Sequence, residues 1–209
     1  MSGFAAAFAV GVAVAAPVGP VGVLCIQRTL RGGVPFGLAS GLGVATADGL
    51  YAALAALGLA VVAKAASVLQ APLGVTGGVL LLVLAYRAWG QAGHSCEAAM
   101  EPTTRGLLAT WGSAFGLTLA NPATIMSFAA IMAGLGAALA NPGNGQVFVA
   151  GIVLGSLAWW TFLALAVGFA RTRAPRALVD WAGRVSALIM GVAGVAALAA
   201  GMTTFAQIR

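Results

Sequence analysis

Long apolar runs alternate along the chain with short segments that hold nearly all of its charge. Runs without any Asp, Glu, Lys or Arg cover residues 1–27, 65–86, 106–170 and 185–208. Because a bilayer span needs about 20 predominantly apolar residues, each run can cross a membrane at least once. The run 106–170 is long enough for two spans, with a turn at the sequence NPGNGQ of residues 141–146.

This pattern predicts six membrane-spanning segments, at residues 4–26, 37–62, 70–90, 106–138, 147–170 and 185–206. The expected fold is therefore all-α, a polytopic membrane protein. The fourth segment is too long for one straight helix, and the sequence ANP at 120–122 predicts a break in it. The polar segment 91–105 is expected to be a linker loop between a first three-span unit (1–90) and a second (106–209).

Composition gives the same class. Hydrophobic residues make up 61% of the 209 residues and charged residues 7%. A soluble domain normally carries about 25% charged residues, so this chain has too few to cover a soluble surface. The net charge of +6 does not indicate nucleic-acid binding, because the basic residues are scattered at span ends and form no patch. The predicted environment is the bilayer of the inner (plasma) membrane.

Basic residues predict the orientation. Eight of the ten lie in the loops 1–2, 3–4 and 5–6 or at the adjoining span ends, namely Arg28, Arg31, Arg87, Arg105, Arg171, Arg173, Arg176 and Arg184. The opposite side has only Lys64 and Arg209. Since cytoplasmic loops carry an excess of Lys and Arg, these three loops are expected in the cytoplasm and both termini on the periplasmic or extracellular side.

Each half opens with a proline-interrupted span, APVGP at 16–20 and ANPAT at 120–124. Three spans in each half would make the second half an inverted repeat of the first. Paired interrupted helices of this kind point to a transport site near the bilayer midplane. A broken helix offers free N–H groups to a carboxylate and free carbonyls to a cation. The candidate site residues at the breaks are Pro17, Gly19, Pro20, Asn121 and Pro122; the alternative is a proline kink that only shapes packing.

Asp48 is the only acidic residue inside a predicted span. A charge at the bilayer centre costs about 2.5–3.5 kcal/mol on insertion scales, and such residues face a cavity or a partner. Two functional roles fit Asp48: a proton carrier, or a counter-charge for a substrate ammonium. The alternative role is structural, with Asp48 capping a broken helix of a neighbouring span.

Several polar or aromatic residues are further candidates for substrate contact. Asn121 can donate and accept hydrogen bonds at once, which suits a zwitterion, although it could also satisfy carbonyls freed by Pro122. Thr124 and Ser127 share one helix face just past that proline, but hydroxyls in spans more often bond their own backbone. Trp159 belongs to a mid-span tryptophan pair, for which packing is the favoured role and closure over a substrate the other.

Metal and cofactor chemistry is not expected. Cys25 and Cys96 are predicted to be free thiols, and His94 is the only histidine, so neither a disulfide nor a metal site is predicted. A phosphate-binding glycine loop needs a preceding strand and a following basic residue, and this chain has neither. The numerous glycines instead suit close helix packing, and glycine-rich faces are compatible with a homodimer.

These motifs resemble the lysine exporter (LysE) family of amino-acid translocators, near its threonine and homoserine branch. The matching pieces are APVGPVGVLCIQRTLRGG in the first span, GLASGLGVATADGLYAALAALGLA in the second, RGLLATWGSAFGLTLANPATIMSFAAI in the fourth and GSLAWW in the fifth. The resemblance implies a six-span secondary exporter that moves amino acids or similar metabolites out of the cytoplasm, driven by an ion gradient. The family often has a basic residue directly after Asn-Pro, where this chain has Ala123.

The leading hypothesis is therefore secondary active export of an amino acid or related small zwitterion, with proton coupling and without a cofactor. A divalent-cation permease is the alternative, although hard cations want several oxygens and one Asp supplies few. A membrane enzyme or thiol carrier would need a nucleophile–base pair or paired cysteines. A purely structural membrane protein would have no reason to bury Asp48.

Overall fold

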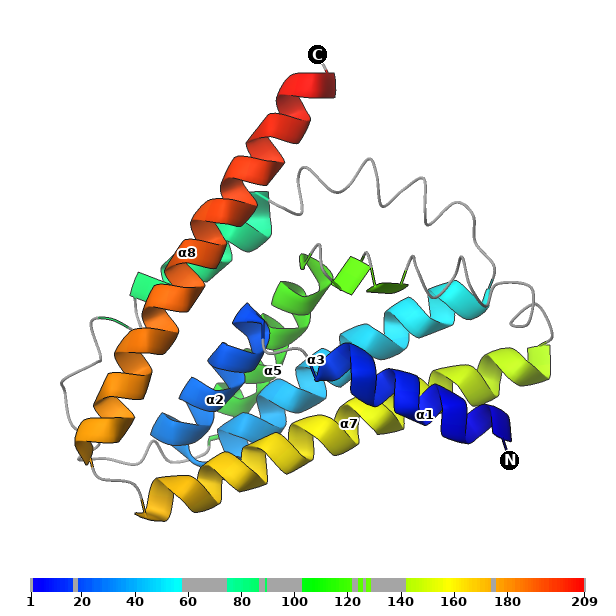
Figure 1. Ribbon diagram of the computed structural model, residues 1–209, viewed down its shortest axis with the longest axis horizontal. Helices are drawn as coiled ribbons and strands as arrows, with labels where there is room; N and C mark the ends of the chain where they lie inside the picture. The colour runs from blue at the N-terminus through cyan, green and yellow to red at the C-terminus, as the bar shows by residue number, and fades with distance from the viewer. Residues whose placement is uncertain are drawn as a thin grey trace.

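The computed structural model describes residues 2–16, 19–57, 75–86, 89, 103–121, 124–125, 127–128, 142–173 and 176–208. All regular structure in these residues is helical, which confirms the all-α class (Figure 1). The helices are α1 (Ser2–Ala15), α2 (Pro20–Gly32), α3 (Val34–Ala56), α5 (Thr104–Leu119), α7 (Pro142–Arg173) and α8 (Arg176–Ile208). A shorter apolar helix, Val75–Tyr86, lies between α3 and α5 in the sequence.

Two described helices are long and apolar enough to cross a membrane alone, α3 and the Gly145–Arg173 part of α7. The pair α1 and α2 passes as a third candidate if it is one broken span. These helices fit a helical membrane protein. Parts of the predicted spans 37–62, 70–90 and 106–138 lie outside the described residues, so six spans and an inverted repeat remain predictions.

The first predicted span, 4–26, contains the expected break, with one helix on each side of it. Helix α1 ends at Ala15, α2 begins at Pro20, and the two are bent by 80°. Proline is well tolerated in the first turn of a helix, where its missing N–H would have no helical partner, so Pro20 starts α2 instead of interrupting it. The second part also continues to Gly32, past the predicted end. Pro17 lies outside the described residues.

Gly33 makes the tight turn from α2 into α3. Its φ of 88° lies in the left-handed region that side chains disfavour, and its N–H donates to the Thr29 carbonyl at 2.9 Å. The turn folds α3 back against α2. A Cβ on Gly33 would lie 3.1 Å from Nη1 of Arg171, so the last turn of α7 also reaches this point.

Helix α3 packs antiparallel to α7 through small residues. Gly37 faces Ala164, Gly41 faces Trp160 and Gly49 faces Val153. The residue numbers on α7 decrease as those on α3 increase, as expected for antiparallel helices. The opposite side of α3 meets α5, where Gly43 lies against the backbone of Trp111. Glycine permits this close approach of helices on both sides.

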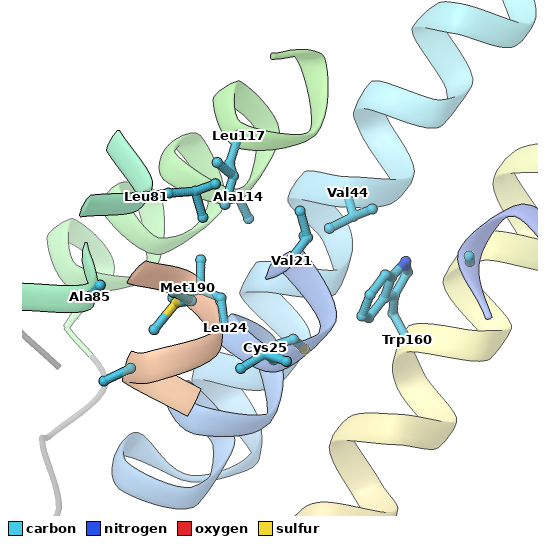
Figure 2. Packing of buried hydrophobic residues seen from close by; sticks show 13 residues of the cluster. Val21, Leu24, Cys25, Val44, Leu81, Ala85, Ala114, Leu117, Trp160 and Met190 are labelled. Atoms are coloured by element: carbon cyan, nitrogen blue, oxygen red, sulfur yellow. The ribbon is translucent and has the colours of Figure 1, made fainter. Parts of the chain in front are cut away.

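Helix α2 lies at the centre of the main hydrophobic cluster (Figure 2). The cluster combines Val21, Leu24 and Cys25 of α2 with side chains from α3, the helix Val75–Tyr86, α5, α7 and α8, namely Val44, Leu81, Ala85, Ala114, Leu117, Trp160 and Met190. The start of α2, just after the first break, is therefore surrounded by protein rather than lying at the edge of the bundle.

Candidate functional site

The two chain breaks meet at one cavity. Its volume is about 310 Å³, within the lower part of the range for small-ligand pockets. The wall is built from α2, the helix Val75–Tyr86, the end of α5 and α8, through Pro20, Val21, Gly77, Leu81, Leu117, Ala120, Asn121, Ala193, Ala196 and Ala197. Among these described lining residues, Asn121 contributes the one polar side chain, and the others are apolar.

The first break brings the N-terminus of α2 to the cavity. Gly19 is the N-cap, with extended backbone (φ −92°, ψ −171°) and no side-chain cap, and Pro20 follows in the first turn. The N–H groups at the start of a helix have no partner within that helix and carry partial positive charge. This end of α2 can therefore attract a negative group.

The second break brings the C-terminus of α5 to the same cavity. Helix α5 ends at Leu119, and the N–H of Asn121 turns back to the Thr118 carbonyl at 3.1 Å. The Asn121 carbonyl in turn accepts from the N–H of Ile125 at 3.2 Å, so helical structure resumes beyond the break. The last carbonyls of α5 carry partial negative charge. Pro122 lies outside the described residues.

Tyr51 of α3 ties together the two sides of the second break. Its hydroxyl donates to the Leu119 carbonyl at 2.7 Å, which is one of the carbonyls left without a helical partner where α5 ends. Its ring stacks on Phe128, beyond the break, with ring centroids 5.4 Å apart. The sequence prediction missed Tyr51; the available signal was its position one helical turn after Asp48.

Asp48 lies at the interface of α3 and α7. Its side chain is buried, and Ser156 Oγ of α7 donates to Asp48 Oδ2 at 2.7 Å. The structural alternative expected Asp48 to cap a broken helix, but Ser156 lies inside the continuous helix α7. Tyr51 satisfies a carbonyl at the break instead. Asp48 is not among the residues that line the cavity.

The predicted site residues Thr124, Ser127 and Trp159 are not among the residues that line the cavity. Thr124 and Ser127 follow the second break, and Ser127 is exposed. Of the tryptophan pair, Trp160 is the buried member of the main cluster, whereas Trp159 is half-buried and packs against it beside Phe162.

Arg28 has a different environment from the one expected for a residue at a span end. It is partly buried within the bundle and joins three helices. Its Nη1 donates to Ser40 Oγ of α3 at 3.2 Å and to the Thr110 carbonyl of α5 at 3.0 Å, and its Nη2 donates to Ser113 Oγ at 2.6 Å. The sequence could not show this because α2 continues beyond its predicted end.

A helical bundle with apolar candidate spans and a cavity between two broken helices defines a membrane transport protein. The LysE type translocator family model matches residues 12–201, and the chain belongs to this family. It is also 30% identical over 183 residues to the uncharacterized membrane protein YahN of Escherichia coli (strain K12), covering 85% of this chain and 81% of that protein. No solved structure matches the chain.

Family membership makes this chain a membrane translocator of small molecules in a lipid environment. Members of the LysE type translocator family are transporters rather than enzymes, and they export amino acids or related compounds.

Proposed function

We propose that the protein exports an amino acid or related small zwitterion from the cytoplasm by secondary active transport, coupled to protons. The observation that carries this proposal is the single cavity shared by the start of α2 and the end of α5. Ends of broken helices recognise anionic groups and cations in other secondary transporters.

A zwitterion suits the opposite polarity of the two helix ends. In this arrangement the substrate carboxylate faces the first-turn N–H groups of α2. The ammonium faces the last carbonyls of α5 and the side-chain oxygen of Asn121. The remaining wall, which includes Leu81, Leu117 and three alanines of α8, receives the substrate side chain.

Asp48 is the proposed proton carrier. Its carboxyl group is buried between α3 and α7 and accepts a hydrogen bond from the hydroxyl of Ser156. Because that hydroxyl is neutral, Ser156 supplies no positive charge to balance an ionised carboxylate. Asp48 does not line the cavity. Protonation of Asp48 would therefore act on the substrate through the helices rather than by direct contact. This arrangement favours the carrier role over direct contact with a substrate ammonium.

A divalent-cation permease is the second candidate, and the cavity argues against it. Hard cations bind through six or more oxygens in most sites. Of the described residues that line the cavity, Asn121 alone bears a side-chain oxygen, and Asp48 is not among them.

A transport screen tests the proposal. Purified protein in liposomes is offered a panel of labelled amino acids with and without a pH gradient, and Mn²⁺ uptake is followed in parallel. We expect one or a few amino acids to move, faster with the gradient, and no Mn²⁺ flux. Flux of Mn²⁺ without any amino-acid flux would replace the proposal with the permease alternative.

A further inference from the structure

We infer that Arg28 forms a second, outer binding station that takes the carboxylate of the transported substrate before it reaches the cavity. The inference rests on the proposed function for the identity of that carboxylate. Its structural basis is separate and consists of hydrogen-bond donors that lack acceptors on one turn of α2.

The three oxygens around the Arg28 guanidinium are all neutral. They belong to two serine hydroxyls and one backbone carbonyl. Among the residues that the structure describes, no carboxylate reaches this guanidinium. All described side chains that contact this partly buried cation are neutral, so an anionic ligand would stabilise it.

The contacts hold the guanidinium in one orientation and leave part of it unused. Arginine has five N–H donors in a planar fork. Two N–H groups on Nη1 serve Ser40 and Thr110, and one on Nη2 serves Ser113. Ser113 also donates to the Thr110 carbonyl at 3.0 Å, and this hydrogen bond holds two of the three acceptors in place relative to each other. Nε and the second N–H of Nη2 have no acceptor in the described ranges, and a carboxylate can accept from such an edge with both oxygens.

Gln27 adds another donor on the same turn of α2. Its side chain is 4% exposed, and Nε2 has no hydrogen-bond partner in the described part of the chain. A buried donor left without an acceptor costs about 1–3 kcal/mol. An ionised carboxylate, which only accepts hydrogen bonds, would suit such a donor.

Arg28 is separate from the cavity at the breaks. Arg28 lies eight positions after Pro20 on α2, which corresponds to about 12 Å along a helix. It lies toward the basic turn at Gly33, where Arg31 precedes the turn and Arg171 approaches it. Clustered positive charge raises the local concentration of anions. If this side is cytoplasmic, as the arginine distribution predicts, a substrate leaving the cell meets Arg28 before the cavity.

Thermal unfolding of the purified full-length protein tests the station without a known substrate. The probes are sodium acetate, acetamide and sodium phosphate, each compared with sodium chloride at matched ionic strength. A ligand at ten times its dissociation constant raises the midpoint of a protein of this size by roughly 3–6 °C. We expect a rise of this kind with acetate and none with acetamide, which has the same shape without the charge.

Variants connect the effect to Arg28. Arg28→Gln should abolish the acetate effect, whereas Arg31→Gln, which removes the same charge from the same helix, should retain it. Arg28→Lys, which keeps the charge but loses the fork, should weaken the effect, and it replaces Arg28→Gln if that variant fails to fold. Equal acetate effects in wild type and the Arg28 variants, or no acetate effect in wild type, would overturn the inference. Stabilisation by phosphate alone would also overturn it and indicate a lipid headgroup site.

Transport separates this inference from the proposed function. For an amino acid that the wild type carries, Arg28→Gln should raise KM roughly 10–100-fold with a smaller change in kcat, as expected from loss of a charged hydrogen bond. If no amino acid is transported while acetate still acts through Arg28, the proposed substrate class is wrong and the carboxylate station stands.

Discussion

At the scale of single residues, Asp48 and Tyr51 form a connection from a buried carboxyl to a helix break. Ser156 holds Asp48 from α7, and Tyr51, one turn later on α3, holds the Leu119 carbonyl at the end of α5. Asp48 and Tyr51 are three residues apart on α3, so their side chains lie on neighbouring parts of the helix surface, and a change of charge at Asp48 acts close to Tyr51. The proposed coupling therefore uses side chains of one helix that touch two others.

Asp48→Asn keeps the shape of the side chain and removes its titration. We expect a folded, inserted protein whose gradient-driven transport falls at least roughly tenfold, since a functional ionisable group in a span would be lost. Exchange without a gradient should survive if Asp48 carries the proton and fail if it contacts the substrate. Wild-type rate with an unchanged pH dependence would leave only a structural role for Asp48.

Tyr51→Phe keeps the ring on Phe128 and removes the hydroxyl that bonds the Leu119 carbonyl. Leaving that carbonyl unpaired should lower the free energy of unfolding by about 1–3 kcal/mol. It should also shift the pH profile of transport, a result that packing alone does not predict. The matched control is Tyr86→Phe, because Tyr86 is 82% exposed. An unchanged profile in Tyr51→Phe would remove Tyr51 from the coupling.

At the scale of elements, both breaks could be predicted from sequence, whereas the contacts of Tyr51 and Arg28 with neighbouring helices could not. The prolines and Asn121 mark the breaks because proline disrupts local helix hydrogen bonding. The positions of Tyr51 and Arg28 depend on how closely α3 approaches α5 and on where α2 ends. Those features arise from packing between helices far apart in sequence, so local patterns carry little information about them.

Small residues also determine the position of α1, the helix that precedes the 80° bend. Gly155 of α7 lies so close to the Phe8 carbonyl of α1 that a Cβ would clash with it. Gly155→Ala should therefore lower the free energy of unfolding by about 1–3 kcal/mol through overpacking. Gly112→Ala is the control, since a Cβ there meets nothing within 4 Å. Thermal unfolding of both variants measures the difference, and equal stability would contradict close packing of α1 on α7.

At the scale of the whole molecule, the arginine distribution predicts which side of the membrane each end faces. Thr104 is exposed at the start of α5 and adjoins Arg105. In a background with Cys25 and Cys96 changed to Ser, a cysteine at position 104 should react with a membrane-impermeant maleimide only after the cytoplasmic face is opened. Labelling of intact cells at position 104, or of position 209 only from inside, would reverse the predicted topology.

The central claim is that the substrate passes through the cavity between the two breaks. The most direct measurement compares transport by Ala196→Phe and Ala199→Phe in liposomes, using an amino acid that the wild type carries. Ala196 lines the cavity and Ala199, on the same helix, does not. A benzyl group in the cavity should clash with the substrate and reduce transport by roughly tenfold or more, while the Ala199 variant stays within about twofold of wild type. Equal transport by both variants would contradict the account.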